Sequence, residues 1–129
     1  MNLAAPGLGE VSDRLTILAL KILIGTEQGK DVAHFQRERA LLLAKVRSRT
    51  PNGAWFDSVM ELAAVNGQLW QSEDDLRRLR ATTEVQHTDV FLSRVLAVAF
   101  RIQFLNDRRA ELVAQINKDA GESQGEEKL

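Results

Sequence analysis

Proline, the residue that most reliably interrupts a helix, is almost absent from this chain and lies outside its periodic segments. The 129 residues contain only two prolines, Pro6 and Pro51. Elsewhere, apolar residues recur at the three- and four-residue spacing of helices, and no segment shows the two-residue alternation of a half-buried strand. The sequence also contains no internal repeat. We therefore predict an all-α protein.

Glycine and capping residues set the bounds of the first two predicted helices. The first helix is predicted over residues 9–24 and ends at Gly25. The second is predicted over residues 31–49, with Asp31 as its N-cap, and ends just before Pro51.

The remaining two predicted helices are longer. The third covers residues 54–80. The fourth covers residues 88–118, with Thr88 or Asp89 as its N-cap and Gly121 as the residue that ends it. Four helices, of which the third and fourth are long, predict a four-helix bundle.

Length and composition indicate a single domain. A chain of 129 residues can bury one core. Its 44% hydrophobic and 27% charged residues are close to the averages of soluble globular proteins. We expect residues 1–118 to form the domain. Residues 119–129 are mostly Gly, Glu, Ser, Gln and Lys and predict a disordered C-terminal tail.

Composition excludes several classes of function. Seventeen Lys and Arg against eighteen Asp and Glu give a net charge of -1, so we expect no nucleic-acid partner. The lack of cysteine excludes disulfides, thiolate metal sites and cysteine nucleophiles. The apolar run from Leu15 to Ile24 contains Lys21 and is too short to cross a bilayer. The N-terminus lacks the basic start of a signal peptide, so we expect a cytoplasmic protein that does not bind membranes.

The first predicted helix is apolar on most of its surface. One aliphatic stripe consists of Val11, Leu15, Leu18 and Ile22. Most of the remaining surface is covered by Ile17, Leu20, Leu23 and Ile24. A helix that is apolar on so many sides lies at the centre of a bundle or in an interface between subunits. We expect a homodimer that is joined partly through this helix.

The third and fourth predicted helices carry polar residues within their apolar stripes. In the third helix these residues are Asn66, Glu73 and Arg77. In the fourth, Arg109 lies near the middle of the stripe, and Asn106 and Asn117 lie at its edge. Buried charges have to be paired, so we expect Glu73 to pair with Arg77 one turn away and with Arg109 of the neighbouring helix.

Together with the narrow polar strip of the first helix, these residues form what we call the polar constellation. Its members are Glu10, Arg14, Lys21, Asn66, Glu73, Arg77, Asn106 and Arg109. Four members are cations and two are carboxylates, so a phosphate or carboxylate ligand would balance the charge. Such sites are common in bundle cores. The alternative is a satisfied network that fixes helix register and binds nothing.

Neither a metal ion nor an organic cofactor is expected. Two pairs of carboxylates are candidates for a divalent ion: Glu10 with Asp13, and Glu73 with Asp74. Both pairs lie beside arginines, which compete for the carboxylates. The two histidines, His34 and His87, lie far apart in the sequence and are expected on the surface. There is no glycine loop of the type that cradles phosphates.

Three segments carry motifs in a fixed order along nearly the whole chain. In one-letter form they read GE..DRLTIL..K from Gly9, VN..LW..ED..R from Val65 and ND.RA.....IN from Asn106. With these motifs and its closing Glu126-Glu127-Lys128, the chain resembles an uncharacterised bacterial family of small helical proteins, a domain of unknown function. The motifs coincide with most of the polar constellation, so the resemblance supports that set of residues without implying a chemistry.

A second resemblance concerns the first helix alone. With Glu10, Asp13, Arg14 and Lys21 on a framework of Leu and Ile, it is similar to the opening helix of helical chorismate mutases. The sites of those enzymes are cationic pockets between helices, which implies an enzyme acting on a carboxylate or phosphorylated metabolite as one hypothesis. The hypothesis we favour is a small helical assembly or binding protein with a cationic site between helices for a small anionic ligand.

Overall fold

The computed structural model describes residues 6–49, 51–81 and 88–122, which form four helices and no strand. The helices are α1 (Leu8–Glu27), α2 (Ala33–Ser48), α3 (Gly53–Ala81) and α4 (Asp89–Asp119). The predicted all-α four-helix bundle is confirmed. The third and fourth helices are the longest, at 29 and 31 residues. None of the described helices combines the length and apolarity needed to cross a membrane.

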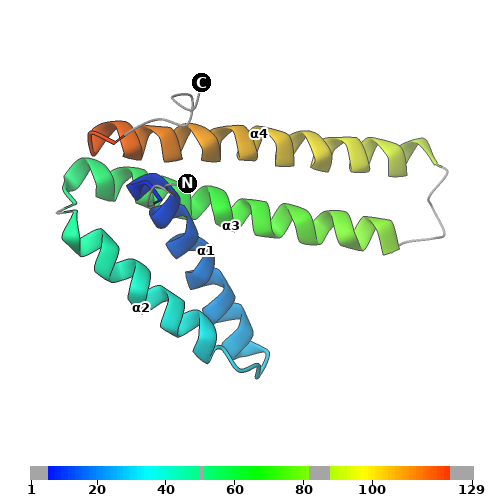
Figure 1. The fold of residues 1–129 in the computed structure, drawn as a ribbon. Coiled ribbons are helices and arrows are strands. Elements are labelled where there is room, and N and C mark those ends of the chain that lie inside the picture. The colour runs from blue at the N-terminus through cyan, green and yellow to red at the C-terminus, as the bar shows by residue number, and fades with distance from the viewer. Residues whose placement is uncertain (1–5, 50, 82–87, 123–129) are drawn as a thin grey trace, which may run out of the picture.

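A long antiparallel hairpin of α3 and α4 is the scaffold of the bundle (Figure 1). At 1.5 Å per residue these two helices are about 45 Å long. Helix α1 starts where α3 begins and α4 ends, and it runs obliquely away from the hairpin, while α2 returns alongside α1. Because α1 contacts all three other helices, it is the central helix, which is one of the two placements that its apolar surface predicted.

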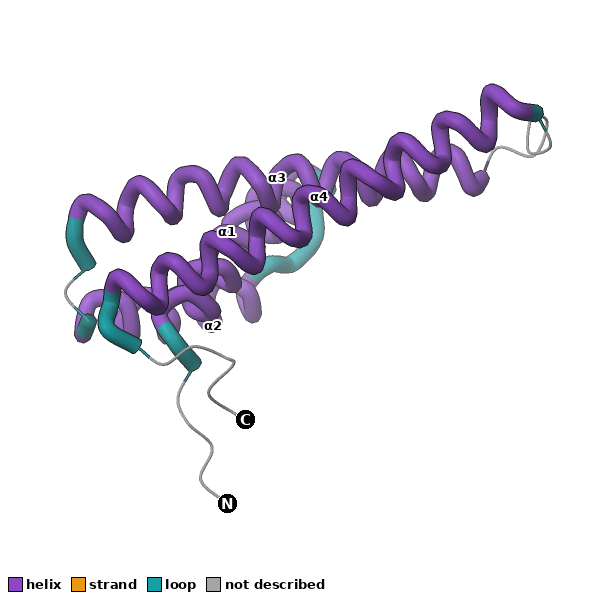
Figure 2. Tube along the Cα trace, turned by 90° about the horizontal axis from the view of Figure 1, so that it is seen from above, coloured by secondary structure: helices purple, strands orange, loops and turns teal. Residues whose placement is uncertain are grey.

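Helices α1 and α2 cover only part of the hairpin. Viewed from above, the turn-side end of α3 and α4 projects beyond both helices (Figure 2). We call the turn-side part of the hairpin, residues 73–81 and 89–101, the distal end of the hairpin. Among the described distal residues, Val98 is the only buried hydrophobic side chain. The apolar residues Leu76, Leu79, Phe91 and Val95 are half-buried there.

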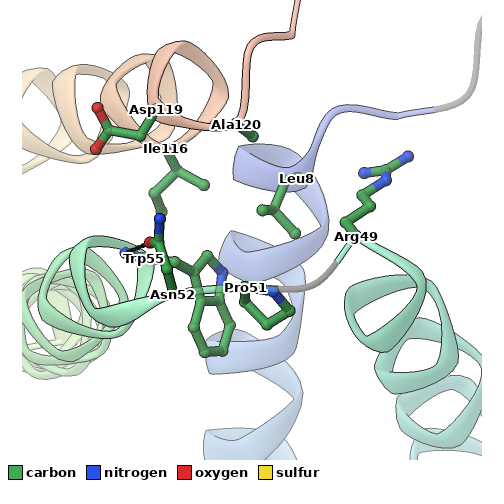
Figure 3. A pocket seen from close by; sticks show the side chains of 8 residues that line it. All are labelled: Leu8, Arg49, Pro51, Asn52, Trp55, Ile116, Asp119 and Ala120. Atoms are coloured by element: carbon green, nitrogen blue, oxygen red, sulfur yellow. Dashed lines mark hydrogen bonds between the residues drawn. The ribbon is translucent and has the colours of Figure 1, made fainter.

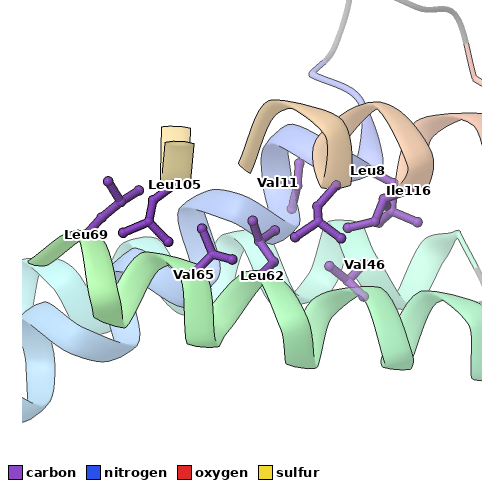
Figure 4. Close-up of a cluster of buried hydrophobic side chains, with 9 residues drawn as sticks. Leu8, Val11, Val46, Leu62, Val65, Leu69, Leu105 and Ile116 are labelled. Atoms are coloured by element: carbon purple, nitrogen blue, oxygen red, sulfur yellow. The ribbon is translucent and has the colours of Figure 1, made fainter. Parts of the chain in front are cut away.

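The hydrophobic core lies at the other end, where α1 crosses the hairpin (Figure 4). All four helices contribute to one cluster of buried side chains: Leu8, Val11, Val46, Leu62, Val65, Leu69, Leu105, Leu112 and Ile116. Full burial of such a side chain stabilises a fold by roughly 1.5–3 kcal/mol. The covered end therefore supplies most of the hydrophobic stabilisation.

The end of α1 differs from the prediction. Gly25 lies inside α1, and a Cβ added to it would come within 2.6 Å of a methyl carbon of Val32. The helix ends instead before Gly29, whose φ is 71°. The N–H of Lys30 donates to the carbonyl of Gly25 at 2.8 Å, which closes the helix in a Schellman motif. A glycine that allows close packing and a glycine that ends a helix look alike in a sequence.

Other predicted helix ends agree more closely with the structure. The hydroxyl of Thr88 accepts a hydrogen bond from the N–H of Phe91, which confirms Thr88 as the N-cap of α4. Asp31 lies one residue before the N-cap of α2, and its carboxylate accepts from the N–H of Ala33 at 3.0 Å. Gly121, with a φ of 73°, follows the end of α4 as predicted.

Residues 119–122, which composition assigned to the tail, belong to the domain. Asp119 is the last residue of α4. The carboxylate of Glu122 accepts from the N–H of Leu8 at 3.1 and 3.2 Å, and it lies 3.5 Å from the guanidinium of Arg49. The domain therefore extends at least to Glu122, and the rest of the predicted tail, residues 123–129, lies outside the described residues.

Candidate functional site

The eight residues of the polar constellation do not form one site. Asn66 and Arg109 belong to a buried network, Glu10 lies at the start of α1, and Arg14 pairs with α2. Lys21 and Arg77 line an open pocket. Glu73 and Asn106 are exposed.

The buried network is centred on Asp13 of α1, which the polar constellation did not include. Arg109 of α4 donates to both of its carboxylate oxygens, from Nε at 2.9 Å and from Nη2 at 2.6 Å. Asn66 of α3 donates to Asp13 Oδ1 at 2.8 Å and to the hydroxyl of Thr16 at 2.7 Å. The network therefore ties three helices together where α1 crosses the hairpin.

The network is satisfied within the chain. Asn66 is only 4% exposed, and its amide nitrogen has acceptors in Asp13 and Thr16. The two-point contact of Arg109 with Asp13 is the strongest geometry for such an ion pair. Hydrogen bonding to Asp13 is the largest cause that raises the pKa of Arg109, against the opposing effect of burial. For Asn66 and Arg109, this arrangement is a satisfied network of the kind that the sequence offered as the alternative, although its acceptors are Asp13 and Thr16.

The predicted pairing of Glu73 with Arg77 and Arg109 is wrong. Glu73 is exposed, Arg109 pairs with Asp13, and Arg77 pairs with Asp74 on its own helix. The physical reason is the path of α1, which diverges from α3 beyond the core (Figure 1). The face of α3 that is covered at Asn66 is therefore open to solvent two and three turns later, at Glu73 and Arg77.

The start of α1 is closed by a side chain from the end of α4. Gly7, the N-cap residue, has no side chain to offer, so the first N–H groups of α1 need other partners. Asn117 accepts from the N–H of Gly9 at 2.6 Å and donates to Glu10 Oε1 at 2.9 Å. A Cβ at Gly9 would collide with the carbonyl oxygen of Val113, so glycine is required for this close crossing. Asn117, not Asn106, is the buried asparagine of α4.

A cavity of about 220 Å³ lies beside this end of α1 (Figure 3). It is lined by Leu8, Arg49, Pro51, Asn52, Trp55, Ile116, Asp119 and Ala120. The guanidinium of Arg49 donates to the carbonyl of Pro6 at 3.0 Å and lies 3.5 Å from the carboxylate of Glu122. Its charge is therefore neutralised within the chain.

Arg14 has a partner that sequence analysis did not identify. Its guanidinium makes two hydrogen bonds to the carboxylate of Glu38 on α2, at 2.8 and 2.9 Å. This hydrogen bonding is the largest cause that raises the pKa of Arg14 and lowers the pKa of Glu38. Arg14 therefore holds α2 against α1.

Lys21 and Arg77 line a pocket of about 670 Å³ between the α1–α2 turn and the middle of α3. We call it the open pocket. Its charged or titratable residues are Lys21, Lys30, Asp31, His34, Asp74 and Arg77. Two aromatic residues, Phe35 and Trp70, also line it, and the Lys21 ammonium lies 5.3 Å from the centre of the Phe35 ring.

The charges of the open pocket are not balanced. Both of its carboxylates already have partners. Asp31 accepts a hydrogen bond from the N–H of Ala33, and Asp74 forms an ion pair with Arg77. Among the described residues, no carboxylate lies within ion-pair distance of Lys21 or Lys30. The pocket thus has an excess of positive charge that faces solvent.

The residues of α1 at the buried network are marked by a weak pattern in the sequence. Gly9, Asp13 and Thr16 follow one another at spacings of four and three residues, so they share one face of α1. A row of small and polar side chains on an otherwise aliphatic helix indicates a close helix crossing with hydrogen bonds across it. No comparable pattern marks Glu38.

No group of three or more His, Asp and Glu side chains in the described ranges is arranged to hold a metal ion. His34 lines the open pocket, and His87 lies outside the described residues. Comparison of the chain with protein-family models, curated proteins and solved structures gave no match. The resemblance to the bacterial family therefore stays a prediction, and function has to be inferred from the geometry of the chain itself.

Proposed function

We propose that this protein binds a small organic anion, a carboxylate or a phosphate ester, in the open pocket. The observation that carries the proposal is the convergence of Lys21, Lys30 and Arg77 from separate elements around one volume of about 670 Å³. Pockets of about 300–1,000 Å³ are the usual size for small organic ligands. Asp74 already pairs with Arg77, whereas no carboxylate among the described residues lies within ion-pair distance of Lys21 or Lys30, so these two ammonium groups are available to a ligand.

The lining suggests how such a ligand would be held. Lys21 and Lys30 are flexible ammonium donors, and Arg77 offers a planar fork that suits a carboxylate or phosphate. Phe35 and Trp70 supply apolar faces beside the cations. An anion with an apolar portion would use both features, whereas inorganic phosphate would use only the charge.

Thermal unfolding with and without ligand tests the proposal. We expect millimolar benzoate or phenyl phosphate to raise the melting temperature of the parent protein, and inorganic phosphate to raise it less. A ligand at about 100 times its dissociation constant stabilises a protein by ~2.7 kcal/mol. Lys21→Met and Arg77→Met should abolish the shift.

The matched control is Arg108→Met. This arginine lies on α4 outside the open pocket and pairs with Glu61 at 2.5 Å. Its loss should leave the ligand-induced shift intact. If none of the three anions shifts the parent, or if Lys21→Met and Arg77→Met retain the shift, the proposal is wrong.

The alternative is an enzyme that acts on a carboxylate or phosphorylated metabolite in the same pocket. The observation in its favour is His34 in the lining, because histidine is a common general acid or base in enzymes. NMR of the bound anion over time would detect its conversion. An enzyme in which His34 transfers a proton should lose turnover but keep binding in His34→Gln, whereas an unchanged anion would favour binding alone.

A further inference from the structure

One face of α4 carries a row of exposed apolar side chains. Leu92, Leu96, Phe100 and Phe104 are spaced by four residues, and each is between 52% and 68% exposed. We call this row the α4 ridge. At 100° per residue, Leu96 and Phe100 point away from the side of the buried Val98, which faces α3. The ridge therefore lies on the outer surface of the hairpin.

The α4 ridge is also free of charged side chains. Between Asp89 and Asp107 the only charged residues of α4 are Arg94 and Arg101, which lie seven residues apart on one flank of the helix. Arg101 is turned toward α3, where it donates to the hydroxyl of Ser72 at 2.9 Å and to Asp75 at 3.0 Å. Contiguous apolar patches of this kind often serve as interaction surfaces, and this row is about 18 Å long.

We propose that the α4 ridge is the contact with a second copy of this chain, in which two α4 helices pack antiparallel about a two-fold axis. An axis between Leu96 and Phe100 sets Leu96 against Phe100 of the other copy, and Leu92 against Phe104. Each leucine then meets a phenylalanine, so the row is complementary to itself, as a two-fold interface requires. Rows at four-residue spacing are also the ridges that interdigitate in the commonest class of helix crossing.

The area of the α4 ridge fits this partner. Its four side chains expose roughly 450 Å², within the range of the largest apolar patch on a typical monomer. Two copies would bury about 900 Å² of apolar surface. With the polar residues at the rim, the total approaches the ~1,200 Å² at which stable interfaces begin. Among the described residues, α3 is the one helix that lies beside the distal part of α4, so a second copy would supply the missing cover (Figures 1 and 2).

The first helix, through which the sequence predicted a dimer, is the competing surface. Leu23 is 58% exposed there and lines an apolar groove of about 380 Å³ between α1, α2 and α3. Under a two-fold axis that passes through the groove, the groove faces its own equivalent and both grooves stay unfilled. A protruding row packs directly against its equivalent, so the α4 ridge satisfies two-fold symmetry better.

Sedimentation equilibrium of the full chain at micromolar concentration tests this proposal, which is independent of anion binding. We expect the parent to be a dimer, and Phe100→Glu to raise the dissociation constant at least about a hundredfold, because it buries one carboxylate per subunit. The matched control is Leu23→Glu on α1, which should stay dimeric. Both positions are exposed in the monomer, and circular dichroism should show the parental helix content in both variants.

Selective loss of the dimer in Phe100→Glu would support the proposal. A monomeric parent, a dimeric Phe100→Glu variant, or equal loss of the dimer in Leu23→Glu would overturn it. Loss in Leu23→Glu alone would instead assign the contact to α1.

Discussion

Two ion pairs in this bundle consist of the same residue types but differ in how far they are exposed to solvent. In each, an arginine of the hairpin meets an aspartate: Arg109 with Asp13, and Arg77 with Asp74. The side chains of the first pair are 34% and 14% exposed, and those of the second are 64% and 37% exposed. The first pair joins two helices, and Asn66 adds a hydrogen bond to it. The second lies three residues apart on one helix, beside the open pocket.

The path of α1 is what separates the two pairs. Where α1 crosses the hairpin, it encloses the charges, and the carboxylate and guanidinium have to satisfy each other. Where α1 diverges, water solvates both groups, and an exposed ion pair contributes about 0–1 kcal/mol. The enclosed pair therefore serves the fold, whereas the exposed arginine stays available to a ligand. Three experiments test this division.

The largest effect is expected for Asp13→Ala. This change leaves the guanidinium of Arg109 and the buried amide of Asn66 without their shared acceptor, which we expect to cost about 3 kcal/mol of unfolding free energy. The matched change in the exposed pair, Asp74→Ala, should cost no more than about 0.5 kcal/mol. Urea unfolding monitored by circular dichroism measures both. Equal costs would show that the two pairs are equally solvated.

A smaller effect is expected for Arg109→Met. Methionine keeps much of the volume, and Asp13 retains the hydrogen bond from Asn66, so we expect a loss of about 2 kcal/mol. Arg77→Met, its counterpart, should leave the stability of the ligand-free protein within about 0.5 kcal/mol of the parent. Thermal melts without ligand compare the two. If Arg77→Met proves the more destabilising, the open pocket is part of the scaffold.

The fold could be predicted from the sequence because the signals for it are local. Two prolines outside periodic segments, the cap at Thr88 and the glycine at 121 mark helix ends without reference to any neighbour. Gly25 misled the prediction because its role depends on Val32, a residue outside its own helix. Local sequence signals thus predicted the number and length of the helices. They did not distinguish a glycine that allows close packing from one that ends a helix.

The candidate site was harder to predict because burial depends on the neighbouring helix. Asn66, Glu73 and Arg77 do share one face of α3, as their spacing predicted. That prediction treated the face as uniformly covered along 29 residues, whereas it contacts α1 at Asn66 and is exposed at Glu73 and Arg77. Asp13 was left out of the polar constellation for the same reason. Its partners lie on two other helices, and the spacing of residues does not encode the angle at which those helices cross α1.

The smallest effect is expected for Glu73→Ala, which probes the boundary between the two pairs. A buried Glu73 paired with Arg77 and Arg109 would have cost several kcal/mol to remove. In the structure Glu73 is exposed, and its charge is the least of the causes that raise the pKa of Arg109. We therefore expect a change within about 0.5 kcal/mol, as for other surface positions. Denaturant midpoints of the variant and the parent measure it. A loss above about 2 kcal/mol would mean that Glu73 pairs with Arg109 in solution. The two ion pairs would then belong to one network, and the cations of the open pocket would be buried.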